Sequence, residues 1–134
     1  MKSFLVIISF IIIWGTIILL LIEGKAIYNE FLAYNFFKQL KNKKFRTAFN
    51  IIHLIIGKRI KVYLTIELVK GLLSKNKLEQ AYYIYVKTHD ISLKITILEF
   101  MVESCIKNQD DEKLDSFVSM LKSYENENFI ELYK

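Results

Sequence analysis

The chain begins with one uninterrupted apolar segment and then alternates between apolar stripes at helical spacing and short polar turns. Phe4 to Ile22 comprises nineteen residues with no charge and no proline, and fifteen of them are Ile, Leu, Val or Phe. At about 1.5 Å per residue, a helix of this length extends roughly 28 Å, close to the thickness of the hydrocarbon core of a bilayer. The pattern predicts an N-terminal transmembrane helix.

A cleaved signal peptide and a buried core helix are the two alternatives for this segment. A signal peptide has a shorter apolar region, of about 7 to 15 residues, followed by a small-residue cleavage site. Here the apolar segment runs directly into Glu23-Gly24-Lys25-Ala26, without such a site. We therefore interpret residues 1–25 as an uncleaved transmembrane anchor.

Three amphipathic stripes follow the anchor, each with apolar residues at positions i, i+3, i+4 and i+7, as on one face of a helix. The first two begin at Phe45 and Leu78, each after a Lys- and Asn-rich turn, and the third begins at Leu114 after a longer, acidic turn. Further apolar helical segments precede the second and third stripes, and proline is absent. The sequence predicts an all-α fold in which residues 26–124 form about three helical hairpins and residues 125–134 form a polar tail.

The stripes recur at intervals of 33 and 36 residues, and this spacing resembles that of tetratricopeptide and pentatricopeptide repeats. The segment from Glu67 to Lys87 is most similar, since Ala81 takes the small-residue position, with Leu78 three residues before it and Tyr85 four residues after it. In the third stripe, Phe117 stands where a small residue is expected. The resemblance implies a small α-solenoid that binds proteins or peptides and has no chemistry of its own. An ordinary helical bundle is the alternative.

Charge is distributed unevenly along the chain. Residues 1–70 carry a net charge of +8 and residues 71–134 a net charge of −3. Most of the basic residues near the span follow it, so the positive-inside rule places the helical domain on the cytoplasmic or matrix side of a bacterial or mitochondrial inner membrane.

The basic residues after the span have three interpretations: turn solvation with topology control, attraction to anionic lipid, and nucleic-acid binding. Pentatricopeptide-like repeats read single-stranded RNA, but three degenerate repeats with an acidic second half argue against nucleic acid as a partner. The residues that we assign to lipid-headgroup contact are Lys38, Lys41, Lys43, Lys44 and Arg46.

No pattern in the sequence indicates catalysis or a cofactor. His53 and His89 are too far apart for a local metal motif, and the Asp110-Asp111-Glu112 run lacks the pattern of a calcium loop. Cys105 is the single cysteine, so no intrachain disulfide can form. We predict that the protein is not an enzyme, with no catalytic, metal or cofactor residues.

Aromatic residues crowd the segment after the span beyond what anchoring at the membrane interface requires. We therefore predict a membrane-anchored helical-repeat scaffold, a structural or assembly subunit of a multi-subunit membrane complex, whose partners are the other subunits and the bilayer. The alternative is a membrane-tethered RNA-binding or ribosome-associated module. The predicted partner-binding residues are Phe31, Tyr34, Phe37, Tyr82, Tyr83 and Tyr85.

Overall fold

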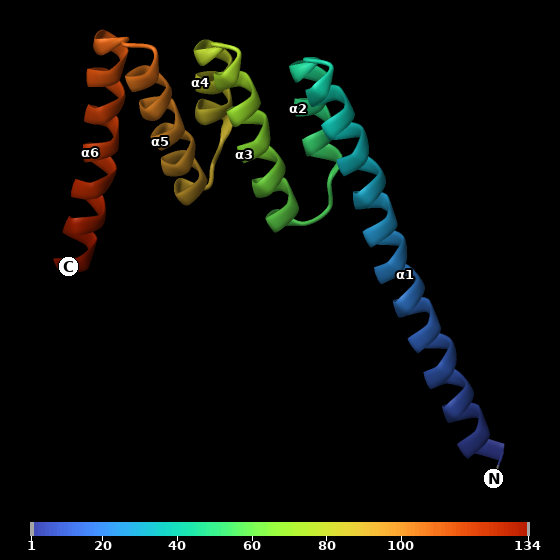
Figure 1. Cartoon of the computed structure of the whole chain (residues 1–134). Helices are drawn as coiled ribbons and strands as arrows, with labels where there is room; N and C mark the ends of the chain where they lie inside the picture. Colours follow the sequence, from blue (N-terminus) through green and yellow to red (C-terminus); the bar gives the residue numbers. More distant parts are fainter. Residues whose placement is uncertain (1, 134) are drawn as a thin grey trace. The chain divides into compact units, whose positions relative to one another are not determined.

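The computed structural model describes the backbone of residues 2–133 and the side chains of residues 2–126, and every regular element in that part is an α-helix. The helices make up 88% of the structure, which confirms the predicted all-α class. In chain order they are α1 (Lys2–Lys41), α2 (Phe45–Leu54), α3 (Lys58–Ser74), α4 (Leu78–Lys87), α5 (Ile91–Lys107) and α6 (Asp111–Tyr133) (Figure 1).

Helix α1 continues without a break past the end of the apolar segment. Its 40 residues correspond to about 60 Å of helix, roughly twice the hydrocarbon thickness of a bilayer. It is long and apolar enough to cross a membrane, and no residue in its most apolar window is buried. The boundary predicted at residue 25 between the anchor and the helical domain therefore lies inside a single helix.

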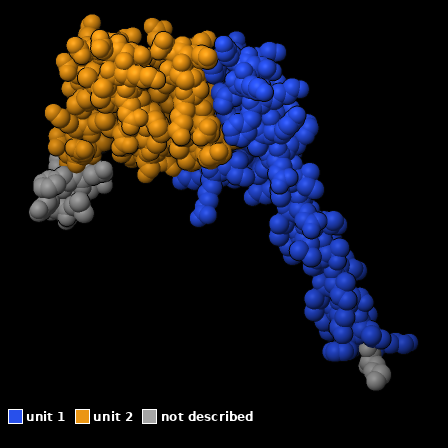
Figure 2. Space-filling model, viewed as in Figure 1, with its two compact units in different colours: residues 1–61 blue, residues 62–134 orange. Residues whose placement is uncertain are grey.

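The chain forms two compact units, residues 1–61 and residues 62–134 (Figure 2). In the first unit, α2 runs antiparallel to the C-terminal half of α1 (Figure 1). The buried apolar residues of this unit are Leu32, Phe36, Phe45, Ala48, Ile52 and Ile55. In the second unit, α4 packs on α5 and α5 on α6, around a core that includes Leu68, Leu72, Ala81, Ile97, Leu98 and Met101.

The same turn connects the helices of each hairpin and recurs at intervals of 33 residues. Lys43, Asn76 and Gln109 have positive φ angles of 60°, 58° and 57°. The N–H of the residue after each of them donates to a carbonyl five residues earlier: Lys44 to Gln39, Lys77 to Leu72 and Asp110 to Cys105, at 2.9 to 3.0 Å. These bonds satisfy carbonyl groups that a helix end leaves unpaired.

The third turn is shorter than predicted, and the predicted alignment of the third stripe with the other two is wrong by three residues. α6 begins at Asp111, so the helices α2, α4 and α6 begin 33 residues apart and the third turn is as short as the other two. Leu114, not Phe117, takes the position of Ala48 and Ala81. Phe117 corresponds instead to Ile84, and both are buried. The local structure is therefore more regular than the apolar pattern indicated.

The C-terminal end of the chain does not form a separate backbone element. α6 continues through the predicted boundary at residue 125 as far as Tyr133. The side chains of the predicted tail from residue 127 onward lie outside the described residues.

Candidate functional site

The part of α1 beyond the apolar segment has two apolar faces. One face carries Leu32 and Phe36, which pack against α2 and are 8% and 0% exposed. The other face carries Ile27, Phe31 and Tyr34, at spacings of four and three residues, and these side chains are 67%, 65% and 69% exposed. We call Ile27, Phe31 and Tyr34 the exposed stripe. It lies on the side of the helix opposite to the α2 contact, because Ile27 and Phe36 are nine residues, or two and a half turns, apart.

Comparison with the other hairpins shows that the exposure of Phe31 is specific to α1. Counting by 33 residues, Phe31 corresponds to Leu64 of α3 and Ile97 of α5. Leu64 and Ile97 are 1% and 0% exposed, whereas Phe31 is 65% exposed. A position that is covered in α3 and α5 is therefore uncovered in α1 and carries an aromatic ring.

Phe37, the third predicted partner residue in α1, lies on the flank of the exposed stripe. It is 40% exposed, and its ring packs edge-on against buried Phe36, with centroids 5.2 Å apart and planes at 81°. This contact fixes the Phe37 ring on the core while part of its surface stays accessible.

The three predicted tyrosines of α4 fall into different environments. Tyr82 and Tyr83 are 42% and 53% exposed, but Tyr85 is only 5% exposed. The hydroxyl groups of Tyr85 and Tyr124 are 2.7 Å apart and share a hydrogen bond, and Lys94 Nζ lies 5.0 Å from the Tyr85 ring centroid. Tyr85 is therefore a core residue that links α4 to α6, and the prediction that places it on a partner-binding surface does not fit this structure.

Burial, followed by the hydrogen bond and the proximity of Tyr124, raises the pKa of Tyr85 well above its usual value of 10.0. The ionised phenolate would lose its hydration and would lie beside another phenol oxygen. Tyr85 therefore stays neutral and hydrogen-bonded at physiological pH.

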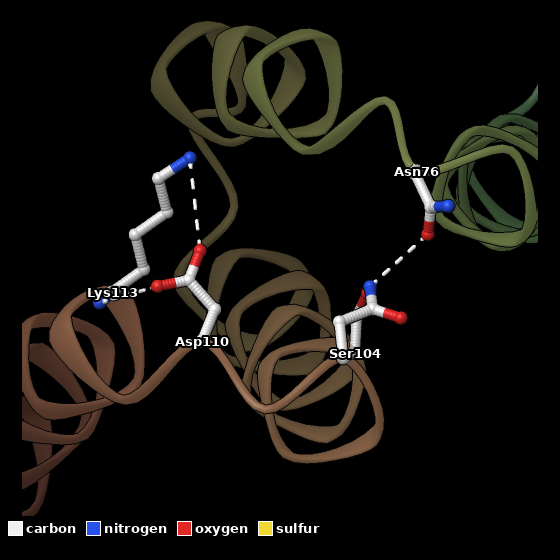
Figure 3. A network of polar contacts seen from close by, with 5 residues as sticks. Asn76, Ser104, Asp110 and Lys113 are labelled. Atoms are coloured by element: carbon white, nitrogen blue, oxygen red, sulfur yellow. Dashed lines mark hydrogen bonds and ion pairs between the residues drawn. The ribbon is translucent and has the colours of Figure 1, made fainter.

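A polar network joins the second and third turns (Figure 3). Asn108 Nδ2 donates to Asn76 Oδ1 at 3.1 Å, and Asp110 Oδ1 accepts from the backbone N–H of Lys113 at 3.3 Å. Lys113 Nζ also lies 3.9 Å from Asp110 Oδ2. The network ties consecutive turns together and caps the start of α6, so its role is structural.

Cys105 is buried, and its carbonyl accepts a hydrogen bond from the N–H of Asp110. Burial, with a smaller contribution from the Asp110 carboxylate, raises the pKa of the Cys105 thiol. A protonated, buried thiol is a poor nucleophile, and we assign Cys105 to the core.

The basic residues that we assigned to lipid headgroups lie at the far end of the first hairpin. Lys38 is sixteen residues after Ile22, which corresponds to about 24 Å along α1. The headgroup region extends only about 5 to 8 Å beyond the hydrocarbon, and the Debye length at physiological salt is about 8 Å. If the apolar segment crosses a bilayer, α1 carries these residues away from the surface, and the geometry favours turn solvation.

A residue that the sequence patterns missed holds the other end of this hairpin. Asn29 is 5% exposed; its Nδ2 donates to the carbonyl of Ile56 at 2.6 Å, and its Oδ1 accepts from the N–H of Ile56 at 3.0 Å. The sequence feature that could have identified Asn29 is its position as a single amide on the apolar helix face that also carries Leu32 and Phe36. We call this pair of bonds the Asn29 clamp.

Within the described residues, no group of three or more His, Cys, Asp or Glu side chains is placed to hold a metal ion. His53 is exposed and packs edge-on against Phe49, with centroids 4.7 Å apart, and His89 is exposed near the end of α4. We take the exposed stripe as the candidate site, because it is an open apolar surface along one helix. In comparisons with protein families, with curated proteins and with solved structures, no match to this chain was found.

Proposed function

We propose that this protein is a single-pass membrane-anchored scaffold whose helical hairpins stack as a small α-solenoid and pack against other subunits of a membrane complex. The observation that carries the proposal is the exposed stripe on α1. Ile27, Phe31 and Tyr34 form an apolar surface on the same helix that supplies the candidate membrane span.

The bilayer itself does not account for the two aromatic residues of the exposed stripe. Phe31 and Tyr34 follow Ile22 by nine and twelve residues, or about 13 and 18 Å along the helix. Both distances exceed the headgroup region of about 5 to 8 Å. Aromatic side chains so exposed in water are typical of protein interfaces, where they contribute a large share of the binding energy.

The hairpin comparison supports an elongated packing surface. In repeat proteins, each unit covers the apolar face of its neighbour, and the terminal unit has one face without a neighbour in its own chain. Phe31 occupies in α1 the position that is buried in α3 and α5. A subunit that covers Phe31 would extend the stack, and the membrane would hold the two partners at a common depth.

The test is affinity purification of the full chain from its native membrane in mild detergent, with the Phe31→Lys variant and a matched control. The control is Ile106→Lys, which changes an equally exposed residue, 60% accessible, in the last turn of α5. We expect a stoichiometric partner with the wild type and with Ile106→Lys, and a loss of at least tenfold with Phe31→Lys. A monodisperse monomer without a copurifying subunit would contradict the proposal.

A further inference from the structure

The connection between α2 and α3 combines exposed apolar and basic side chains in one short segment, residues 54–61. Leu54, Ile56 and Ile60 are 54%, 48% and 37% exposed. Lys58 and Arg59 lie between Ile56 and Ile60 and are also exposed. Gly57 has a φ of +118°, a backbone conformation that residues with a side chain rarely adopt. The chain therefore makes its turn at this glycine. We call residues 54–61 the basic loop.

The basic loop lies on the side of the hairpin that faces the candidate span. Because α2 runs antiparallel to α1, its C-terminal end returns toward the apolar half of α1 (Figure 1). The Asn29 clamp fixes the position of Ile56 along the axis of α1, since both backbone polar groups of Ile56 bind the Asn29 side chain.

If α1 crosses a bilayer, the level of the clamp lies a few ångströms beyond the membrane surface. Asn29 is seven residues after Ile22, or about 10 Å along the helix, and the headgroup region ends about 5 to 8 Å beyond the hydrocarbon. The basic loop is thus held within a few ångströms of the headgroups, within one Debye length of about 8 Å. The turn at the other end of the hairpin, at Lys43, is about 30 Å away from Ile22 by the same measure.

The charges near this level favour an anionic surface. The loop contributes Lys58, Arg59 and Lys61, and the adjacent turns of α1 contribute Lys25 with Glu23 and Glu30, so the net charge of the group is +2. Basic residues at a membrane surface are attracted to anionic lipids, and long basic side chains keep their charged ends at the headgroups.

We propose that the basic loop is a second membrane contact: Leu54, Ile56 and Ile60 enter the interfacial layer, while Lys58 and Arg59 bind anionic phospholipid headgroups. The inference rests on the proposed function only in that α1 must span the membrane. Two contacts, a span and a loop, hold the first hairpin in one orientation at the surface and present the exposed stripe sideways to a neighbouring subunit.

The experiment is fluorescence quenching of the full chain in vesicles that contain brominated lipids, with bromine near the headgroup to reach the basic loop and near the ends of the acyl chains to reach Trp14. Trp14 is the single tryptophan and lies in the candidate span. In a Trp14→Phe background, Ile56→Trp reports on the basic loop, and Leu54→Trp repeats the measurement should the first variant fold poorly. Asn42→Trp, at the opposite end of the hairpin, is the matched control.

We expect quenching and a blue-shifted emission for tryptophan at position 56, and neither for tryptophan at position 42. In phosphatidylcholine vesicles, adding phosphatidylglycerol should increase the quenching at position 56 several-fold. The pair Lys58→Glu and Arg59→Glu should abolish that increase, whereas Lys43→Glu with Lys44→Glu should leave it unchanged.

Each other outcome identifies what has failed. If Trp14 of the native chain is quenched but positions 54 and 56 are not, α1 spans the membrane and the loop proposal is overturned. Equal quenching at positions 42 and 56 also overturns it. If Trp14 itself is not quenched, the membrane anchor fails, and with it both the proposed function and the loop contact.

Discussion

At the scale of single residues, Asn29 has the most specific role in the first hairpin. Its amide group satisfies both the N–H and the carbonyl of Ile56, 27 residues further along the chain. A buried backbone group that loses its partner costs about 1 to 3 kcal/mol. We predict that Asn29→Ala lowers the free energy of unfolding of the first hairpin by about 1 kcal/mol, at the low end of this range because Ile56 is half exposed.

Hydrogen exchange of the Ile56 amide in detergent measures this effect directly, since the same substitution should accelerate it. Asn35→Ala is the matched control, because the Asn35 amide donates to the carbonyl of Phe31, one turn away on the exposed part of the same helix. Equal exchange rates in the two variants would show that the Asn29 clamp does not hold the loop.

Tyr85 gives a prediction on pH dependence. Its folded-state pKa is raised, so the unfolded chain loses this proton near pH 10 while the folded chain keeps it. The contribution of Tyr85 to stability is therefore present below pH 10 and is lost as the pH rises above 10. We predict that chemical denaturation shows a steeper loss of stability above pH 10 for the wild type than for Tyr85→Phe.

At neutral pH, Tyr85→Phe removes the hydrogen bond to Tyr124 and should cost about 0.5 to 1.5 kcal/mol. Tyr82→Phe is the control, since Tyr82 makes ring contacts with Tyr85 and Phe117 that do not need its hydroxyl group. Parallel pH profiles for the wild type and Tyr85→Phe would contradict the assignment of the raised pKa to this residue.

Residue-scale burial follows from the sequence only in part. Ala48 and Ala81, the small residues of the first two stripes, are both fully buried, as a close helix crossing requires. The stripe of α4 also includes Tyr82 and Tyr85, and the apolar spacing cannot separate them. In the structure Tyr82 is 42% exposed and Tyr85 5%, and the Tyr85 hydroxyl group pairs with Tyr124 of α6.

At the scale of elements, the three turns share one strained position. Lys43 and Gln109 adopt the left-handed conformation, which costs roughly 1 to 2 kcal/mol for a residue with a side chain, whereas asparagine, as at Asn76, tolerates it better. Glycine relieves this strain, at an entropic cost of about 0.5 to 1 kcal/mol. We predict that Lys43→Gly raises the stability of the first hairpin by about 0.5 to 1 kcal/mol, measured by thermal unfolding in detergent.

Lys38→Gly is the control for that change. Lys38 is an exposed residue inside α1, where glycine lowers helix stability by about 1 kcal/mol. If both variants lose stability, the left-handed conformation at Lys43 is not the source of strain.

Most element boundaries were predictable because apolar spacing and turn residues agree along most of the chain. The third stripe was aligned three residues too late, because its first apolar residue, Leu114, was matched to the first residues of α2 and α4 although it comes three residues after the start of α6. The better signal was Asp110, which caps α6 with its side chain and is followed by the acidic residues Asp111 and Glu112 in the first turn. Capping residues therefore mark a helix start more reliably here than the apolar stripe.

At the scale of the whole molecule, the charge difference across the span makes a prediction about topology. We predict that the chain after α1 lies on the cytoplasmic or matrix side, because Lys25 and the basic residues of the first hairpin cluster after the span. Protease added to inverted membrane vesicles should digest this part of the chain, and protease added to intact cells or mitoplasts should leave it whole. The reverse pattern would contradict the prediction.

The continuous helix α1 has a consequence for any partner that contacts it both within the bilayer and beyond the membrane surface. Thr16, within the apolar segment, precedes Ile27 by eleven residues, or about three helical turns, so the two residues face the same direction. Inserting one residue after Ile22 would rotate the part of α1 that follows Ile22 by about 100° relative to the apolar segment. It would also shift that part by about 1.5 Å along the helix axis. A subunit that grips both halves at once would sense that change in phase, whereas a subunit that touches only one half would not.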